Sequence, residues 1–196
     1  MPNHLLATLG RVRKNGKTRY EPTHYEFPDK TLSPPCTFFG HALFQFLSQN
    51  RHISIDQFII VGTSGSMWDS LLELNDDLFF ANQHLHDQLG KAVQAESVTS
   101  DILSQLERLL REKLQIPFRL VLIPCAIQPS DQIQILQTLA DLMDRGDSLW
   151  LDITHGFRHL PLIQFASALH LRHAKDIQIK GIYYGAFDAQ NEMGYP

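Results

Sequence analysis

Short apolar segments alternate with longer segments of helical periodicity along most of the chain, and this alternation limits the folds that the chain can adopt. The strand-like runs span residues 4–10, 56–62, 118–124, 147–153 and 177–184. The segments with apolar residues at helical spacing span residues 36–49, 97–114, 130–145 and 157–174. Such an alternation is typical of a mostly parallel sheet with helices on both faces. We therefore expect an α/β fold of this type.

An insertion follows the first expected strand. Asn15-Gly16 is a strong two-residue hairpin signal, which predicts an N-terminal β-ribbon from about residue 11 to 27. A chain of 196 residues with 43% hydrophobic residues is long enough to bury a core, so we expect residues 1–196 to form a single domain. The chain ends soon after the last expected strand. We therefore expect either a stand-alone unit or a longer chain from which a second domain has been left out.

The composition excludes several classes of function. No apolar run approaches the roughly 18 residues that span a membrane, and the N-terminus does not fit a secretory signal. A net charge of −4 argues against a face that binds duplex DNA, although a local cationic cluster can still bind a small anion. We expect Cys36 and Cys125 to be buried free thiols in a reducing cytoplasm. The ten histidines show no spacing that completes a metal site, so we expect neither a metal nor a cofactor.

The segment Leu149–Pro161, LWLDITHGFRHLP, combines a buried strand with polar groups at its end. Asp152 interrupts the apolar run, and a buried carboxyl is costly unless it is hydrogen-bonded, so we expect it to brace the following loop. The loop and the start of the next helix offer a hydroxyl, an imidazole, backbone amides and a guanidinium to a ligand. The helix start favours phosphate, and an arginine fork suits the same group. The expected ligand-facing residues are Thr154, His155, Gly156, Phe157 and Arg158.

A second loop rich in glycine and hydroxyl groups follows the strand at 56–62. Its glycines allow close approach of the backbone, and its amides can form an anion-binding nest. It matches neither a Walker A loop, nor GxGxxG, nor the GxSxG nucleophile elbow. A plain tight turn explains it as well, and Trp68 is either a base-stacking ring or a core indole. The expected ligand-binding residues are Gly62, Thr63, Ser64, Gly65, Ser66, Met67 and Trp68.

A third loop begins with Gly10 and Arg11, after the first expected strand. In a parallel sheet, the carboxyl ends of the strands lie at one edge, so these three loops should meet there. Open α/β sheets bind their ligands at that edge. We therefore predict one ligand-binding site that includes Gly10, Arg11 and the two loops described above, with Asp152 in a bracing role and no residue assigned to catalysis.

The segment 157–174 carries apolar residues on more than one helical stripe. A helix that packs only on a sheet needs a single apolar face of roughly 100°. This helix should therefore contact the sheet on one side and a second subunit on the other, in a symmetric homodimer. The alternative is that another helix of the same chain covers the second stripe.

The pentapeptide Asp152-Ile153-Thr154-His155-Gly156 with its FRH continuation resembles the signature of the CRISPR-associated DxTHG-motif family. The start of the chain, LLATLG with Tyr20 and Tyr25 in the ribbon, and VGTSGSMWD at 61–69 are also similar to that family. The resemblance implies a CARF domain, a CRISPR-associated Rossmann-like fold. It also implies a homodimer that binds a cyclic oligoadenylate, of four or six units, across its two-fold axis during type III CRISPR antiviral defence. Binding would then activate an effector. The RxxxxH pair typical of a HEPN ribonuclease does not follow the sensor-like part, so we expect any effector output to be absent from this chain or supplied by a partner, with a fused or separate effector domain as the possibilities.

Two other functions remain open at the level of the sequence. A ring nuclease of the same fold would cleave the messenger, with parts of the chemistry supplied by Arg11, Ser64, Ser66, His155 and Arg158. A dinucleotide-dependent or hydrolytic α/β enzyme unrelated to CRISPR would need a phosphate-binding fingerprint that the chain lacks.

Overall fold

The computed structural model describes residues 1–11, 20–156 and 159–186. Its centre is a five-stranded sheet in which every pair of neighbouring strands is parallel, in the order β3-β2-β1-β4-β5. This arrangement confirms the α/β fold expected from the sequence. The strands are β1 (Asn3–Leu9), β2 (Gln57–Gly62), β3 (Phe118–Leu122), β4 (Ser148–Asp152) and β5 (Gln178–Tyr183).

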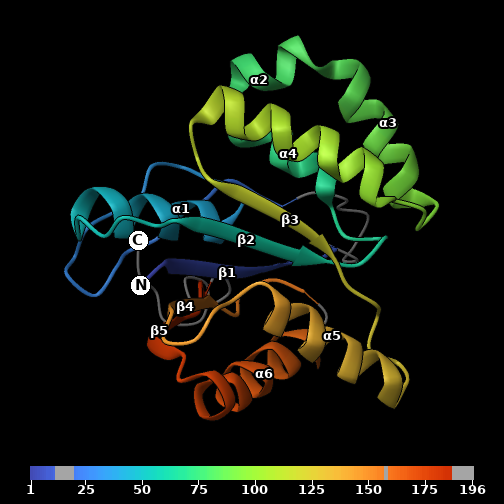
Figure 1. Cartoon of the computed structure of the whole chain (residues 1–196). Helices are drawn as coiled ribbons and strands as arrows, with labels where there is room; N and C mark the ends of the chain where they lie inside the picture. The colour runs from blue at the N-terminus through green and yellow to red at the C-terminus, as the bar shows by residue number, and fades with distance from the viewer. Residues whose placement is uncertain (12–19, 157–158, 187–196) are drawn as a thin grey trace.

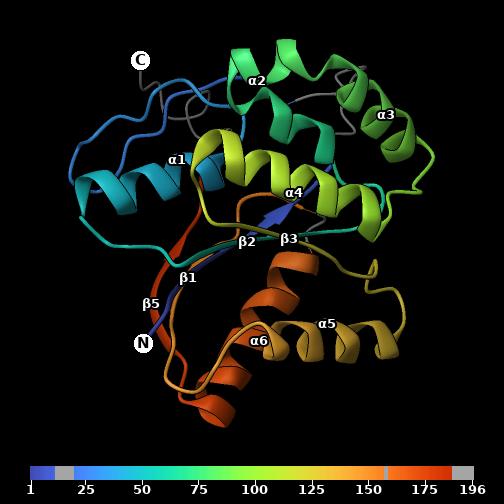
Figure 2. The ribbon, with the colours of Figure 1, turned by 45° about the horizontal axis from the view of Figure 1, so that its top comes forward.

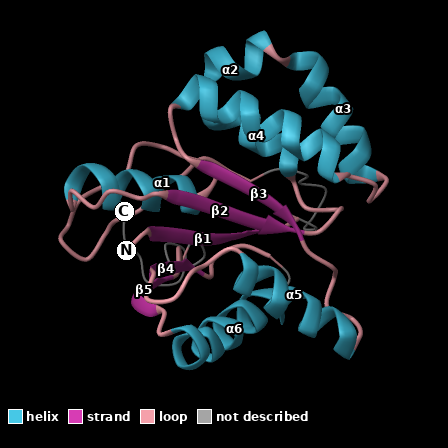
Figure 3. Ribbon diagram, viewed as in Figure 1, coloured by secondary structure: helices cyan, strands magenta, loops and turns pink. Residues whose placement is uncertain are grey.

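Helices cover both faces of the sheet (Figures 1 and 2). Two α-helices, α5 (Pro129–Asp141) and α6 (His159–Lys175), form one layer. The opposite layer contains the remaining helical segments, as the secondary-structure view also shows (Figure 3). These are α1 (Phe39–Gln45) with the π-helical turn η1 (Phe46–Asn50), the 3-10 helix η2 (Trp68–Leu74), α2 (Asp76–Ala81), α3 (Gln83–Gln94) and α4 (Ser100–Leu114).

Two hydrophobic cores result, one on each side of the sheet. Successive side chains of a strand point to opposite faces. In β1, Leu5 and Ala7 therefore join the core under α1 and α4, and Leu6 joins the core under α5 and α6. Central strands that are buried on both faces read as continuous apolar runs, which explains why β1, β2 and β4 were recognisable in the sequence.

The order of the strands reverses between β1 and β4. The chain proceeds from β1 to β2 and β3 on one side, then crosses to the other side of β1 to form β4 and β5. In open α/β sheets, ligands bind outside the carboxyl ends of the strands at such a reversal. The reversal therefore indicates the carboxyl ends of β1 and β4 as the expected position of a ligand-binding site.

The boundaries differ from the sequence predictions at several points. Half of the predicted ribbon, residues 12–19, lies outside the described residues. The part from residue 20 onward makes isolated antiparallel bridges with a later segment, at Thr23–Cys36 and Glu26–Leu32. The predicted helix 130–145 ends at Asp141, and the Lys175 ammonium donates to the carbonyl oxygens of Ala140 and Met143 near that end. In the described part of the chain, no helix is both long and apolar enough to cross a membrane.

Candidate functional site

The loops after β1 and β4 touch through their backbones. A Cβ atom on Gly10 would lie 2.6 Å from the Cα atom of Gly156, and one on Gly156 would lie 2.7 Å from Cγ2 of Thr8. Gly156 also has a φ of +111°, which side chains disfavour. Only glycine fits at both positions. The backbones of these two loops are therefore in direct contact at the point where the strand order of the sheet reverses.

The loop after β2 is hydrogen-bonded to the end of β1. The Met67 amide donates to the carbonyl oxygen of Gly10 at 2.9 Å. The Ser66 hydroxyl donates to the Leu9 carbonyl at 2.7 Å and accepts from the Thr63 amide at 2.9 Å. The first two loops therefore meet, as the parallel sheet predicts. Thr63, Ser66 and Met67 are buried, and their polar groups stabilise the loop from within.

Trp68 has no exposed surface. Its indole Nε1 donates to the Thr63 carbonyl at 2.8 Å, and its Cζ2 atom would lie 2.7 Å from a Cβ atom on Gly62. Of the two roles considered for Trp68, the structure has the core indole, because the hydrophobic core holds the ring away from solvent. In this structure, Trp68 is not placed to stack on a base.

Arg11 and Ser64 are partly exposed in the first two loops, and Gly65, which lies beside them, is buried. Arg11 Nη1 lies 3.0 Å from Oε1 of Glu96, and the space above Gly65 is bounded by the side chains of Glu96 and Arg11. Ser64 is partly exposed, and its carbonyl oxygen accepts from the Val98 amide. The Arg11 guanidinium, the Ser64 hydroxyl and Gly65 thus lie together beside the backbone contact between Gly10 and Gly156.

Asp152 braces the third loop from below. Its side chain is fully buried, and Oδ1 accepts a hydrogen bond from the Thr154 amide at 2.9 Å. Oδ2 has no hydrogen-bond partner among the described residues. Burial raises the pKa of this carboxyl to about 7. Thr154 uses its hydroxyl to accept from the Gly185 amide at 2.8 Å, which ties the loop to the segment after β5.

The imidazole of His155 lies between two aromatic rings. Its ring centroid is 4.4 Å from that of Tyr20 and 5.4 Å from that of Phe38. Nε2 accepts from the Phe39 amide at 3.3 Å, which requires this nitrogen to be unprotonated. Burial lowers the pKa of His155 to about 4. The ring is therefore neutral at pH 7, and its contacts with Tyr20, Phe38 and the Phe39 amide hold the loop in place.

Sequence reasoning missed two members of this site, Tyr20 and Glu96. The Tyr20 hydroxyl accepts from the Gly10 amide at 3.1 Å, and burial raises the pKa of Tyr20. Glu96 lies 85 residues from Arg11 in sequence and belongs to no motif. Tyr20 was part of the family resemblance, but the sequence assigned it no role in the site. Phe157 and Arg158, which were predicted to face the ligand, lie outside the described residues.

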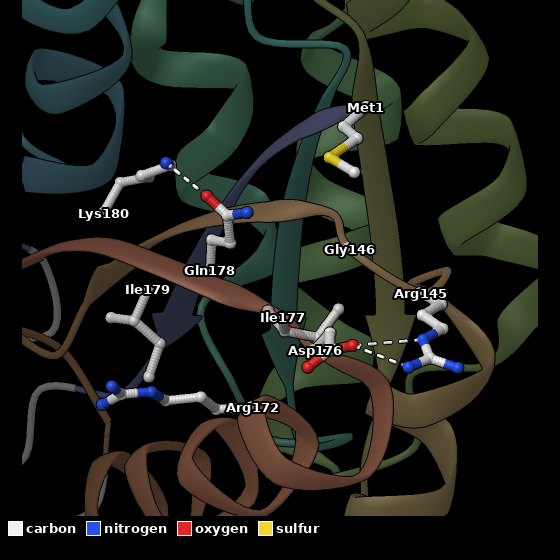
Figure 4. Close-up of a pocket in the computed structure, with 9 residues that line it drawn as sticks. All are labelled: Met1, Arg145, Gly146, Arg172, Asp176, Ile177, Gln178, Ile179 and Lys180. Atoms are coloured by element: carbon white, nitrogen blue, oxygen red, sulfur yellow. Dashed lines mark hydrogen bonds and ion pairs between the residues drawn. The ribbon is translucent and has the colours of Figure 1, made fainter.

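A groove of about 740 Å³ lies at the opposite edge of the sheet, beside the amino end of β5 (Figure 4). None of the predicted ligand-binding residues lines it. Its cationic side chains are Arg145, Arg172 and Lys180, and Arg145 is paired with Asp176. In Figure 4 these cationic groups point in different directions and do not converge on one position. The groove is therefore separate from the candidate site.

Comparison with known proteins agrees with the fold and the motif. Over 97% of its length, the chain is 26% identical to the CRISPR-associated protein MJ1674 of Methanocaldococcus jannaschii. It spans about a third of that relative, 32% of its length. Residues 4–188 match the family described as the CARF domain of the CRISPR system endoribonuclease Csx1. Because this match covers nearly the whole chain, the protein belongs to the CARF-domain family of CRISPR systems.

Proposed function

We propose that this CARF domain is a sensor of type III CRISPR antiviral defence. In the proposed mechanism, a homodimer binds a cyclic oligoadenylate across its two-fold axis and thereby regulates an effector, which is either fused to the domain or separate. The observation that carries the proposal is the convergence of three loops where the strand order of the sheet reverses. That edge is the usual ligand-binding position in open α/β sheets, and family membership supports the messenger class.

The partly exposed residues at this edge, which are Arg11, Ser64, Thr154 and Gly156, suit a ligand with several phosphates. Backbone amides beside glycines can approach phosphate oxygens closely, and hydroxyl groups can donate to them. The Arg11 guanidinium can exchange its carboxylate partner, Glu96, for a phosphate. We assign direct contact to Gly10, Arg11, Ser64, Gly65, Thr154, Gly156, Phe157 and Arg158. The other predicted residues shape the loops that make these contacts: the buried Gly62, Thr63, Ser66, Met67, Trp68 and Asp152, and the half-buried His155.

The outer face of α6 supplies a surface for the second subunit. Leu162 and Leu169 are 68% and 38% exposed, and Ala166 lies between them at helical spacing. The neighbouring helix α5 packs beside α6 and leaves this stripe accessible. An isologous dimer presents each ligand-binding loop twice, which matches a cyclic oligoadenylate with an even number of units.

Isothermal titration calorimetry with cyclic tetra-adenylate, cyclic hexa-adenylate and their linear counterparts tests the proposal. We expect one ring size to bind with one ring per dimer. Arg11→Ala should weaken binding about tenfold or more, because a charge-assisted hydrogen bond contributes roughly 1.5–3 kcal/mol. The matched control is Arg145→Ala, which removes another arginine of a surface ion pair at the opposite edge of the sheet. It should leave the affinity unchanged.

Two outcomes would refute the proposed function. One is the absence of binding for every ring size at micromolar protein concentration. The other is an equal loss of affinity in the Arg11 and Arg145 variants, which would place the ligand elsewhere. Chromatography of the ligand recovered after several hours separates a sensor, which returns intact rings, from a ring nuclease, which returns linear products.

A further inference from the structure

Asp152 is a buried acid next to the proposed anion site, and its hydrogen-bond donors in the described part of the chain come from Thr154 alone. Its side chain has no exposed surface, and Oδ1 has the Thr154 amide as its partner. Oδ2 has none among the described residues. Burying an ionised carboxylate without a cation or a full set of donors is costly, and the usual result is that the group holds its proton. This position is costly for stability, yet it lies directly under the ligand-facing loop.

Among the described residues, the groups around Asp152 supply no positive charge that would favour its ionised form at neutral pH. From its own loop comes His155, a neutral imidazole. The helix α1, which packs against β1 and β4, carries His41, whose pKa burial lowers to about 4. Burial raises the pKa of two phenols in this region, the negative charge of Asp152 raises both further, and Asp69 adds to the shift of the first. These two phenols are Tyr20 and Tyr25, and the cross-strand neighbours of Asp152 are Ala7 and Tyr183.

We propose that Asp152 takes up a proton when a polyanion binds to the loops above it, so that ligand binding and protonation of this carboxyl are coupled. The inference rests on the proposed function, because it takes the anion site to be the edge formed by the three loops. A nearby negative charge disfavours the ionised form of an acid. In a low-dielectric surrounding this repulsion is strong, so an ionised Asp152 would oppose phosphate binding and a neutral Asp152 would permit it.

Calorimetry in buffers of different ionisation enthalpy measures the coupling. For the wild-type protein with the cyclic oligoadenylate that binds, we expect net proton uptake at about pH 8 that disappears at about pH 5, where the acid is already protonated. The affinity should fall as the pH rises through this range. Asp152→Asn keeps the acceptor for the Thr154 amide but cannot titrate, so its proton uptake should be lost and its affinity should depend little on pH. Asp77→Asn, at an exposed position of α2, is the matched control and should behave like the wild type.

A second measurement avoids any dependence on the variant. Carboxyl 13C nuclear magnetic resonance of the ligand-free wild type should show one aspartate that titrates near neutrality, and its resonance should move to the protonated position on ligand binding. Titration of every aspartate near its ordinary range would overturn the inference. Equal proton uptake by the wild type and Asp152→Asn, or binding without uptake by the wild type, would refute the coupling alone. If no oligoadenylate binds, the proposed function fails and the coupling fails with it.

Discussion

At the scale of single residues, the site depends on two glycines that no larger residue can replace and on a buried carboxyl that cannot easily ionise. Gly10 and Gly156 allow two backbones to touch, and Asp152 is buried beneath them with one oxygen unpartnered. The Asp152 brace was predictable, because a carboxyl inside an apolar run needs a nearby donor. The contact between Gly10 and Gly156 was not, because the two residues are far apart in sequence and are joined only by the pairing of β1 with β4.

Gly10→Ala should destabilise the protein by about 1–3 kcal/mol, because the new methyl group would overlap the backbone of Gly156 and force the loops apart. Urea denaturation followed by circular dichroism measures the change. The matched control is Gly90→Ala inside α3, where the nearest atom to the added Cβ is 3.7 Å away. That substitution should stabilise the protein by roughly 0.5–1 kcal/mol. Equal stability changes in both variants would contradict the close backbone contact.

Asp152→Asn should raise the stability of the ligand-free protein in a pH-dependent way. The pKa of Asp152 is about 7 in the folded state, above its ordinary value, so its contribution to stability is complete in acid and is lost as the pH rises from about 4 to about 7. The variant should therefore match the wild type at about pH 4. By about pH 8 its advantage should be on the order of a few kcal/mol. Thermal unfolding over this pH series measures the difference, and a constant difference would show that Asp152 titrates normally.

At the scale of elements, α6 connects the site to the outer surface. On its inner face, the buried Gln164 accepts from the Thr8 hydroxyl and donates to the Leu6 carbonyl at 3.1 Å. Thr8 is also the residue that a side chain on Gly156 would contact. The sequence predicted that α6 has two contact faces, but a glutamine on the sheet-facing side was not foreseen. The role of Gln164 depends on the position of β1 directly beneath α6.

Gln164→Leu should cost about 1–3 kcal/mol, because it leaves buried polar groups of β1 without a partner. Thr8→Val should also destabilise the protein. The double variant should lose less than the sum of the two single variants, by about 0.5–3 kcal/mol, since the second change removes a group that the first left unpaired. Chemical denaturation of all four proteins gives this coupling energy. Strict additivity would show that the bridge contributes nothing to the attachment of α6.

At the scale of the whole molecule, the sheet separates two unequal layers. The larger layer packs against the core under α1 and α4, and in the described part of the chain α5 and α6 are the helices that cover the other core (Figure 1). The exposed apolar stripe of α6 lies on the thinner layer. Burial of apolar surface drives association, so the thinner layer is where we expect the second subunit.

Leu162→Glu should convert the proposed dimer to a monomer, because it places a charge in the apolar contact and, by symmetry, does so twice. Size-exclusion chromatography with light scattering measures the mass. The control is Phe80→Glu on α2, a residue of the other layer with 66% exposure, which should leave the dimer intact. A wild-type protein that is monomeric at all concentrations, or dissociation of both variants, would exclude the α6 face.

The sequence by itself determined the class of fold, the positions of the strands and the loops that meet at one edge. These features follow from local periodicity and from the rule that parallel strands end together. Only the tertiary structure decided that Trp68 is a core residue, that His155 packs between Tyr20 and Phe38, and that Arg11 is paired with Glu96. The physical reason is that burial and pairing depend on which distant segments lie side by side. The order of strands in the sheet sets that arrangement, and no short stretch of sequence contains it.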